Sequence, residues 1–321
     1  MGISMAVFGG DAFTETAQIR ALDKRPYKPN MLDSIIQFEP VPVNTDTVFL
    51  GSTSSTIALI RTTLRGAPIE VGGPDQKNIR PFKIPRLAKG RKLFAHELAN
   101  LAPMDGETDE DAVARRIARM QEQNIEDLEL TEEYQRLGAL SGIVYEPDGT
   151  TVITNFYTEF GIAPPSAVDL TLDNASMTIG ELREKIGTLL VLPIARASGA
   201  GNSPRFRIRA LCGDNFWFKL TGHPAIEKTY QNYAAAADLR REQLWESFVF
   251  AGVEWFHYRG TDDGSTVAIS TNTAKVFPVG IPGMFQHVMG PNNESLATMG
   301  QDGRRYYPFL EEDQSKKKQW V

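Results

Sequence analysis

The sequence predicts a mixed α+β fold with about two domains, and three observations support this prediction. At roughly 150 residues per domain, a chain of 321 residues corresponds to about two domains. A long helix is expected over 108–138, and strands are expected within 41–72 and 142–154. Hydrophobic residues make up 41% of the chain and charged residues 23%, a balance that is typical of folded proteins and excludes general disorder.

The segment 108–138 carries the strongest helical pattern. Thr108 is a suitable N-cap, and the acidic residues after it favour the positive end of the helix dipole. Gly138 is a stop signal, and Asn124 marks a place for a bend. About thirty residues at 1.5 Å each make a rod of roughly 45 Å, which indicates a strut. Apolar residues recur at helical spacing at Val113, Ile117, Met120, Leu130, Tyr134 and Leu137.

Strand-like segments occur on both sides of this helix. In 41–72, apolar residues such as Leu59 and Ile60 fall on both faces of the expected strands. A hairpin of this kind cannot cover itself, so it must lie on other structure in this chain or in another copy. In 142–154, a Pro-Asp-Gly turn separates two β-rich runs and predicts a hairpin.

Further elements are expected in the second half of the chain. Thr178 and Glu181 have the spacing of a capping box, which predicts a helix to about Leu190. We expect 248–258 to pair with 267–270 around a Gly- and Asp-rich turn.

Residues suited to catalysis or metal binding do not converge in the sequence. The pair His96-Glu97 lacks the second histidine of a zinc-protease pattern, because Asn100 occupies that position. The single cysteine, Cys212, lies in an expected strand and is interpreted as a buried, inert thiol. The glycine-rich loop 198–203 is a better match to a surface loop than to a phosphate site. We therefore expect no catalytic residue, cofactor or metal, and we interpret all four histidines as structural: His96, His223, His257 and His287.

The charge distribution favours contacts between proteins over contacts with nucleic acid. The net charge of −6 argues against a surface that grips nucleic acid. A basic run in 79–98 is interpreted as pairing with an acidic surface of a neighbouring subunit, and the alternative is a solvated face. The candidate inter-subunit contact residues are Ile57, Leu59, Ile60, Arg65, Lys83, Arg86, Lys89, Arg91 and Lys92.

Several short blocks, taken in order, resemble the major capsid protein E family of tailed bacteriophages, the lambda-type shell subunit. Each block is moderately specific, and their order and spacing together are distinctive. The resemblance runs from about Leu32 to Arg304, over most of the chain. The blocks are Phe38-Glu39-Pro40, the threonines Thr45 and Thr47, and the runs at 59–68, 80–87, 95–98, 275–280 and 289–291.

The resemblance implies the Hong Kong 97-type phage capsid fold. The family pattern continues beyond the position of Val321, so the resemblance suggests either truncation or a further tail there and leaves the end of the peripheral sheet open. The implied parts are an N-terminal arm (1–40), an extended hairpin called the E-loop (41–92), a peripheral domain (93–175) with a spine helix (108–138), an axial domain (176–290), and a return to the peripheral domain (291–321).

The resemblance also implies a function. It predicts a major capsid protein that self-assembles into hexamers and pentamers, which form an icosahedral head in the host cytoplasm. Further implied partners are portal, scaffolding and decoration proteins and packaged double-stranded DNA, bound without sequence specificity. No membrane partner is expected, and no covalent Lys–Asn crosslinking. The alternatives are an α+β enzyme, which needs a pocket of convergent polar groups, and a nucleic-acid-binding module with steeply salt-dependent affinity.

Overall fold

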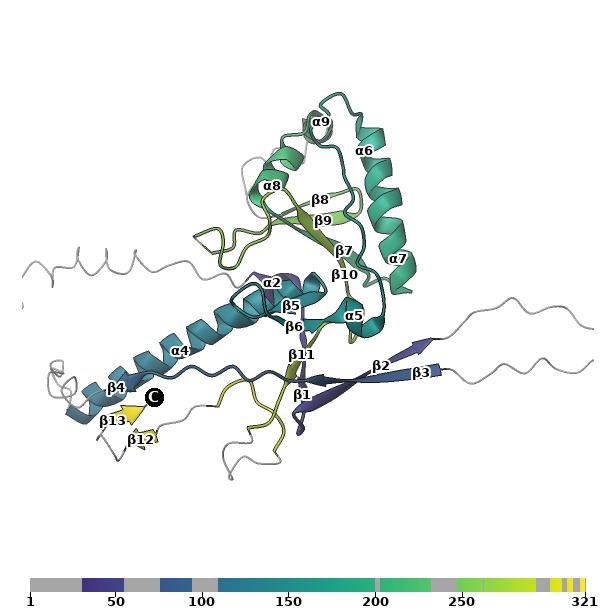
Figure 1. Ribbon diagram of the computed structural model, residues 1–321. Coiled ribbons are helices and arrows are strands. Elements are labelled where there is room, and N and C mark those ends of the chain that lie inside the picture. Colours follow the sequence, from purple (N-terminus) through teal and green to yellow (C-terminus); the bar gives the residue numbers. More distant parts are fainter. Residues whose placement is uncertain are drawn as a thin grey trace, which may run out of the picture. The chain divides into compact units, whose positions relative to one another are not determined.

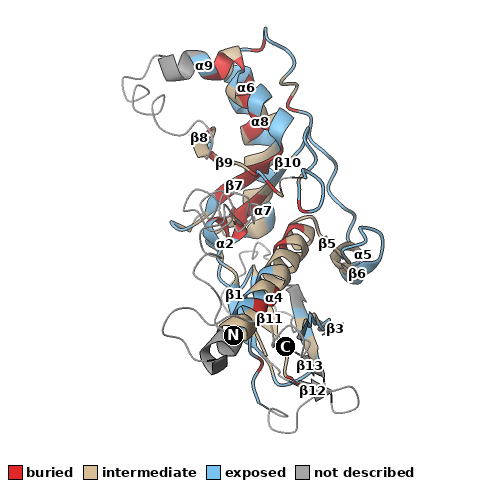
Figure 2. Cartoon of the chain, turned by 90° about the vertical axis from the view of Figure 1, so that its left-hand side faces the viewer, coloured by how far each residue is buried: buried red, intermediate tan, exposed pale blue. Residues whose placement is uncertain are grey.

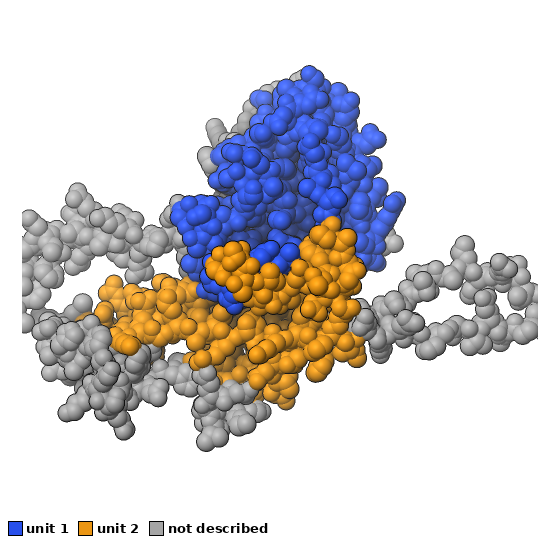
Figure 3. Space-filling model, viewed as in Figure 1, with its two compact units in different colours: residues 1–36, 129–147, 165–282 blue, residues 37–128, 148–164, 283–321 orange. Residues whose placement is uncertain are grey.

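The computed structural model contains both helices and strands, so the predicted mixed α+β class is confirmed (Figure 1). The chain divides into two compact units (Figure 3). Unit 1 contains residues 1–36, 129–147 and 165–282, and unit 2 contains residues 37–128, 148–164 and 283–321. The structure describes residues 31–54, 76–93, 109–199, 203–231, 247–261, 263–292, 301–307, 311–313 and 318–320.

Unit 1 is built on a four-stranded sheet with the order β10-β7-β9-β8. The central strands β7 and β9 are parallel, and each outer strand is antiparallel to its neighbour. The strands are β7 (Arg207–Cys212), β8 (Ser247–Phe250), β9 (Val253–His257) and β10 (Ala274–Val279).

A tight turn separates β8 from β9, and here the sequence prediction was wrong. Ala251 and Gly252 have φ values of 54° and 80°, the left-handed pair of a two-residue hairpin. The run 248–258 is therefore two strands paired with each other. The residues 267–270 form no strand.

Helices supply the rest of the core of unit 1. The indole rings of Trp217 and Trp255 are 1% and 0% exposed at its centre, and buried residues gather along the sheet and the inner helix faces (Figure 2). The predicted capping box is present, because Thr178 and Glu181 bond each other's backbone N–H groups. The helices are α6 (Ile179–Ile186), the π-helical turn η3 (Gly187–Val191), α7 (Leu192–Ser198), α8 (Asp214–Thr221) and α9 (Pro224–Gln231).

The predicted strut is the helix α4 (Asp109–Leu140), of 32 residues. It continues through Asn124, whose buried side chain accepts a hydrogen bond from Arg91 and does not interrupt the helix. Gly138 lies inside the helix and does not end it. A Cβ atom there would lie 2.8 Å from the carbonyl oxygen of Ile143, so Gly138 permits the close approach of the chain that follows the helix.

Short sheets make up most of the regular structure described in unit 2. The hairpin of β2 (Thr47–Ser54) and β3 (Gln76–Lys83) is antiparallel, whereas β1 (Glu39–Pro42) and β11 (Gln286–Met289) are parallel. A three-stranded sheet has the order β12-β13-β4. Its strands are β4 (Lys92–Leu93), β12 (Glu311–Asp313) and β13 (Lys318–Trp320).

Three short elements complete the described structure. The strands β5 (Ile143–Tyr145) and β6 (Val152–Asn155) lie where the sequence predicts the two arms of a hairpin. Asn155 caps the helix α5 (Phe156–Phe160), and the helix α2 (Leu32–Ile35) is a single turn. None of the described helices is long and apolar enough to cross a membrane.

Prolines occupy positions on edge strands where no backbone donor is needed. Ile84 donates its N–H to Asp46 across the β2–β3 hairpin, so the alternation of the strand turns the nitrogen of Pro81 outward. Gly213 donates to Thr273 beside β10, which likewise turns the nitrogen of Pro278 outward. Proline is tolerated at such positions because it removes no ladder hydrogen bond.

We predict that Gly280→Ala destabilises unit 1 more than Gly252→Ala. The two glycines have almost equal φ values, 82° and 80°. A Cβ atom at Gly280 would lie 2.0 Å from the carbonyl oxygen of Arg205, whereas one at Gly252 has nothing within 4 Å. The left-handed backbone costs alanine about 1–2 kcal/mol at either site. The clash adds about 1–3 kcal/mol at Gly280 alone. Chemical denaturation of the subunit checks this, and equal losses would contradict it.

Candidate functional site

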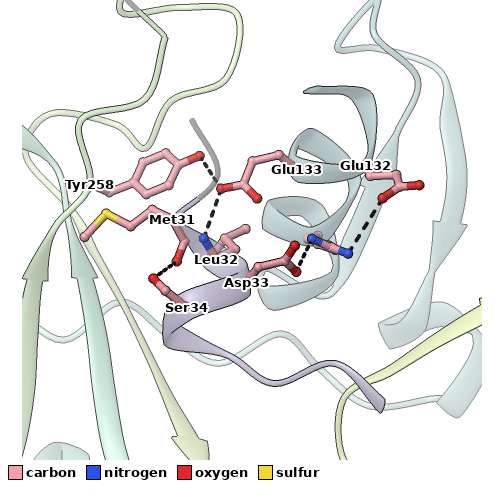
Figure 4. Close-up of polar contacts among 8 residues, drawn as sticks. Met31, Leu32, Asp33, Ser34, Glu132, Glu133 and Tyr258 are labelled. Carbon is pink, nitrogen blue, oxygen red and sulfur yellow. Dashed lines mark hydrogen bonds and ion pairs between the residues drawn. The ribbon is translucent and has the colours of Figure 1, made fainter. Parts of the chain in front are cut away.

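A buried polar cluster joins α2 to α4 and to the residue that follows β9 (Figure 4). A helix of one turn is not stable by itself in water, so α2 depends on its contacts with the rest of the chain. Leu32, Ile35 and Ile36 are 0–3% exposed, which places the apolar side of this segment in the core of unit 1. Fixing α2 also fixes where the chain leaves unit 1 on its way to β1.

Glu133 on α4 is the centre of the cluster and is 1% exposed. Its Oε1 accepts hydrogen bonds from the backbone N–H of Leu32 and from the hydroxyl of Tyr258, both at 3.2 Å. Its Oε2 is buried and has no hydrogen-bond partner among the described residues. Burial raises the pKa of Glu133, and the two hydrogen bonds and the charge of Arg136 only partly oppose this effect.

Two arginines hold the other polar groups of α2. Arg136 pairs with Asp33 at 2.5 Å and with Glu132, one helical turn earlier, at 3.7 Å. Arg209 on β7 donates to the carbonyl oxygen of Ile35 and pairs with Glu254 at 2.7 Å. Hydrogen bonds to charged groups contribute about 1.5–3 kcal/mol each, and solvent reduces this contribution here because Asp33, Arg209 and Glu254 are partly exposed. The cluster positions a chain segment.

The residues of the basic run differ in their contacts and in their exposure. Arg91 binds α4 at two points, with its Nε 3.0 Å from Asn124 Oδ1 and its Nη2 2.9 Å from Asp127 Oδ2. Lys89 lies 3.4 Å from the same Asp127 carboxylate. Lys83, Arg86 and Lys92 are exposed. The remaining candidates lie outside the described residues: Ile57, Leu59, Ile60 and Arg65.

The β2–β3 hairpin has two different faces. On one face, the ring of Phe82 lies 5.8 Å and 6.1 Å from the rings of Phe156 and Phe160 of α5. On the opposite face, Phe49 is 67% exposed and Ile79 is 62% exposed. These two apolar residues were missed by sequence reasoning, which selected the other part of the segment. Side chains alternate between the two faces of each strand, so the register of β2 against β3 shows that Phe49 and Ile79 share a face. That register is not known from the sequence.

The described histidines and the cysteine have structural surroundings. His223 is buried, accepts the N–H of Ala225 at its Nδ1, and bonds the carbonyl oxygen of Asn174. His257 lies 2.8 Å from Asp214 and stacks on the ring of Trp217.

The remaining histidines and the single cysteine lie apart from one another in the sequence. His287 lies on β11, and His96 lies outside the described residues. Cys212 is buried, which raises the pKa of its thiol. Within the described part of the chain, no group of three or more His, Cys, Asp or Glu residues could hold a metal ion.

Comparison with known proteins identifies the family. The sequence model described as "Phage major capsid protein E" matches residues 14–321. The chain belongs to this family. The major capsid protein of Pseudomonas phage KPP10 is 23% identical over 286 residues, and the match covers 78% of each chain. The family match extends beyond the blocks between Leu32 and Arg304 on which the resemblance depends.

Membership of the phage major capsid protein E family gives the surface features a role. Proteins of this family form the capsid shell, so the chain is a structural component of a virion and not an enzyme. The functional parts of such a protein are the surfaces that other copies bury and the contacts that hold those surfaces in place.

We predict that the natural protein loses stability as the pH rises and that Glu133→Gln does not show this loss. The pKa of Glu133 in the unfolded chain is close to the ordinary 4.5, and its pKa in the folded chain is higher. Such a carboxyl group contributes stability that is fully present when the pH is below the unfolded pKa. That contribution is lost as the pH rises through the pKa of the folded chain, because the buried carboxyl group must then ionise. Glutamine keeps the Oε1 acceptor and cannot ionise. Urea denaturation of the subunit at several pH values above 4.5 measures the difference.

Asp148 supplies a control of opposite sign. It accepts hydrogen bonds from Thr150 and Thr151, which lower its pKa to about 2. Its contribution is therefore present above the ordinary 3.8 and is lost as the pH falls through about 2. Asp148→Asn should alter the pH dependence only in that acid range. Identical profiles for the natural protein and Glu133→Gln above pH 4.5 would overturn the assignment of Glu133.

Proposed function

We propose that this chain has the Hong Kong 97-type fold and assembles into hexamers and pentamers, which close into an icosahedral head around phage DNA. The β2–β3 hairpin then belongs to the E-loop, α4 is the spine helix, and the β10-β7-β9-β8 sheet belongs to the axial domain. The proposed divisions are the arm 1–40, the E-loop 41–92, the peripheral domain 93–175, the axial domain 176–290 and the return 291–321.

The observation that carries this proposal is the exposed face of the β2–β3 hairpin. Burial of a large apolar side chain contributes about 1.5–3 kcal/mol, and Phe49 and Ile79 are both mainly exposed in the single chain. A neighbouring subunit that covers this face gains that contribution without any change in the fold. Each copy then both donates a hairpin and receives one, a heterologous contact that closes by rotation into a ring.

The anchoring of α2 supports a second extension. The contacts of Leu32, Asp33 and Ile35 fix this turn, which lies within the proposed arm 1–40. We propose that the arm reaches a neighbouring subunit from this turn.

We also propose partners beyond the chain itself. The shell is assembled in the host cytoplasm with portal and scaffolding proteins, and a decoration protein binds its outer surface. The net charge of −6 suits a shell that encloses DNA without adhering to it.

The proposal predicts that Phe49→Asp prevents assembly and leaves the subunit folded. A charge on this face cannot be buried by a neighbour without a large desolvation cost. The side chain is exposed in the single chain, so the unfolding transition of the subunit should not move. Size-exclusion chromatography and electron microscopy of the expressed protein measure assembly, and Phe49→Leu, which keeps the face apolar, is the matched control. A natural protein that remains a compact monomer under assembly conditions would refute the proposed function.

The basic surface gives a separate prediction. Arg86→Glu combined with Lys92→Glu should reduce particle yield, because each loss of about 1.4 kcal/mol weakens the affinity between subunits tenfold. The charge-preserving pair Arg86→Lys and Lys92→Arg should assemble normally. Circular dichroism establishes that both variants are folded. Normal particles from the charge-reversed variant would show that this surface is solvated and contacts no acidic neighbour.

A further inference from the structure

The two edges of the β1–β11 sheet differ in what they can bind. Glu39 donates its N–H to Phe285, and Val43 donates to Met289, so the odd-numbered residues of β1 face β11. The alternation of an extended strand then turns position 40 and position 42 outward. Both positions are proline, which has no N–H. The outer edge of β1 therefore presents carbonyl groups alone and cannot complete a ladder with another strand.

The outer edge of β11 retains its donors. The same register turns His287 and Met289 toward β1 and leaves the N–H and C=O groups of Gln286 and Val288 on the outer edge. Neither residue has a hydrogen bond from those outer groups to another described residue. Gly303 and Tyr307 approach the end of β11, where their contacts involve Met289 and Gly290. Among the described residues, the sheet is thus closed to strand addition at β1 and open at β11.

We propose that a second copy of this chain binds the open edge through its own β11. Two β11 strands placed antiparallel about a two-fold axis at His287 bring Gln286 of each copy opposite Val288 of the other. Each of these pairs exchanges two N–H···O=C bonds, so all four outward donors and acceptors are satisfied. The pattern is self-complementary, which is the requirement for an isologous contact between identical chains.

A second copy fits this edge better than an unrelated strand for two reasons. The self-pairing register satisfies every group of the edge with the four residues that the strand contains. A capsid also brings copies together at high local concentration, so a contact too weak to form a dimer in dilute solution is effective when repeated over a shell. This inference rests on the proposed function and adds to it a two-fold contact that is distinct from the exposed face of β2–β3.

Cysteine crosslinking in assembled particles tests the register. In the proposed contact, His287 faces His287 of the second copy as a non-hydrogen-bonded pair with Cα atoms about 4.5 Å apart, close enough for a disulfide. His287→Cys particles treated with a mild oxidant should shift to a dimer band on a non-reducing gel. The native Cys212 is buried and contributes no background.

Gln286→Cys is the matched control. In the proposed register, position 286 of one copy lies opposite position 288 of the other, two residues away from position 286 of that copy. The Cα atoms of the two 286 positions are therefore about 8 Å apart, beyond the reach of a disulfide. This variant should remain a monomer on the same gel. The double variant Gln286→Cys and Val288→Cys, which keeps His287, should again give dimers because these positions pair across the axis. It replaces His287→Cys in the test if loss of the imidazole prevents folding.

The outcomes separate this inference from the proposed function. Natural protein that forms no particles under any assembly condition refutes the proposed function. Particles that form normally and yield only monomers from both His287→Cys and the double variant refute the β11 contact and leave the shell function standing. Equal crosslinking of Gln286→Cys and His287→Cys would also refute it, because that result indicates random collision between strands. Dimers from the two predicted variants alone support the contact.

Discussion

A two-stranded β-sheet has no interior, and this constraint governs unit 2. Each face of such a sheet stays in water unless another element or another chain lies on it. The β2–β3 hairpin covers one face with the aromatic rings of α5 and exposes Phe49 and Ile79 on the other. Phe49 and Ile79 are therefore left largely exposed by the single chain, and we propose that a neighbouring subunit covers them in the shell.

Unit 1 meets the opposite condition, because its sheet is buried by its own helices. Trp217 and Trp255 lie at the centre of a core that one chain completes. This stable body is what makes a fixed root for α2 possible, since Glu133 and Arg209 reach that turn from elements that are themselves held rigidly. Unit 1 thus contains the buried core of the chain, and unit 2 carries the exposed apolar face that we propose for contacts between chains.

Prolines restrict where those contacts can form. They occupy outward positions on β1, β3 and β10, where they disrupt no hydrogen bond within the sheet. Because proline has no N–H, the outer edge of each strand lacks a hydrogen-bond donor at that position. A protein that must associate with copies of itself is exposed to wrong pairings at every free edge. The prolines close several edges of the described sheets, and the contact that we propose uses the edge of β11, where the donors remain.

The sequence by itself determined the local elements and the family. The periodicity over 108–138, the capping box at Thr178 and the ordered family blocks each depend on neighbours along the chain, and the helix, the cap and the membership are all present. Only the tertiary structure decided which positions are buried or exposed. Glu133 looked like one more acid on a helix, Gly138 like a stop signal, and Phe49 like part of a strand. Their roles depend on packing and register between segments distant in sequence, which no local pattern encodes.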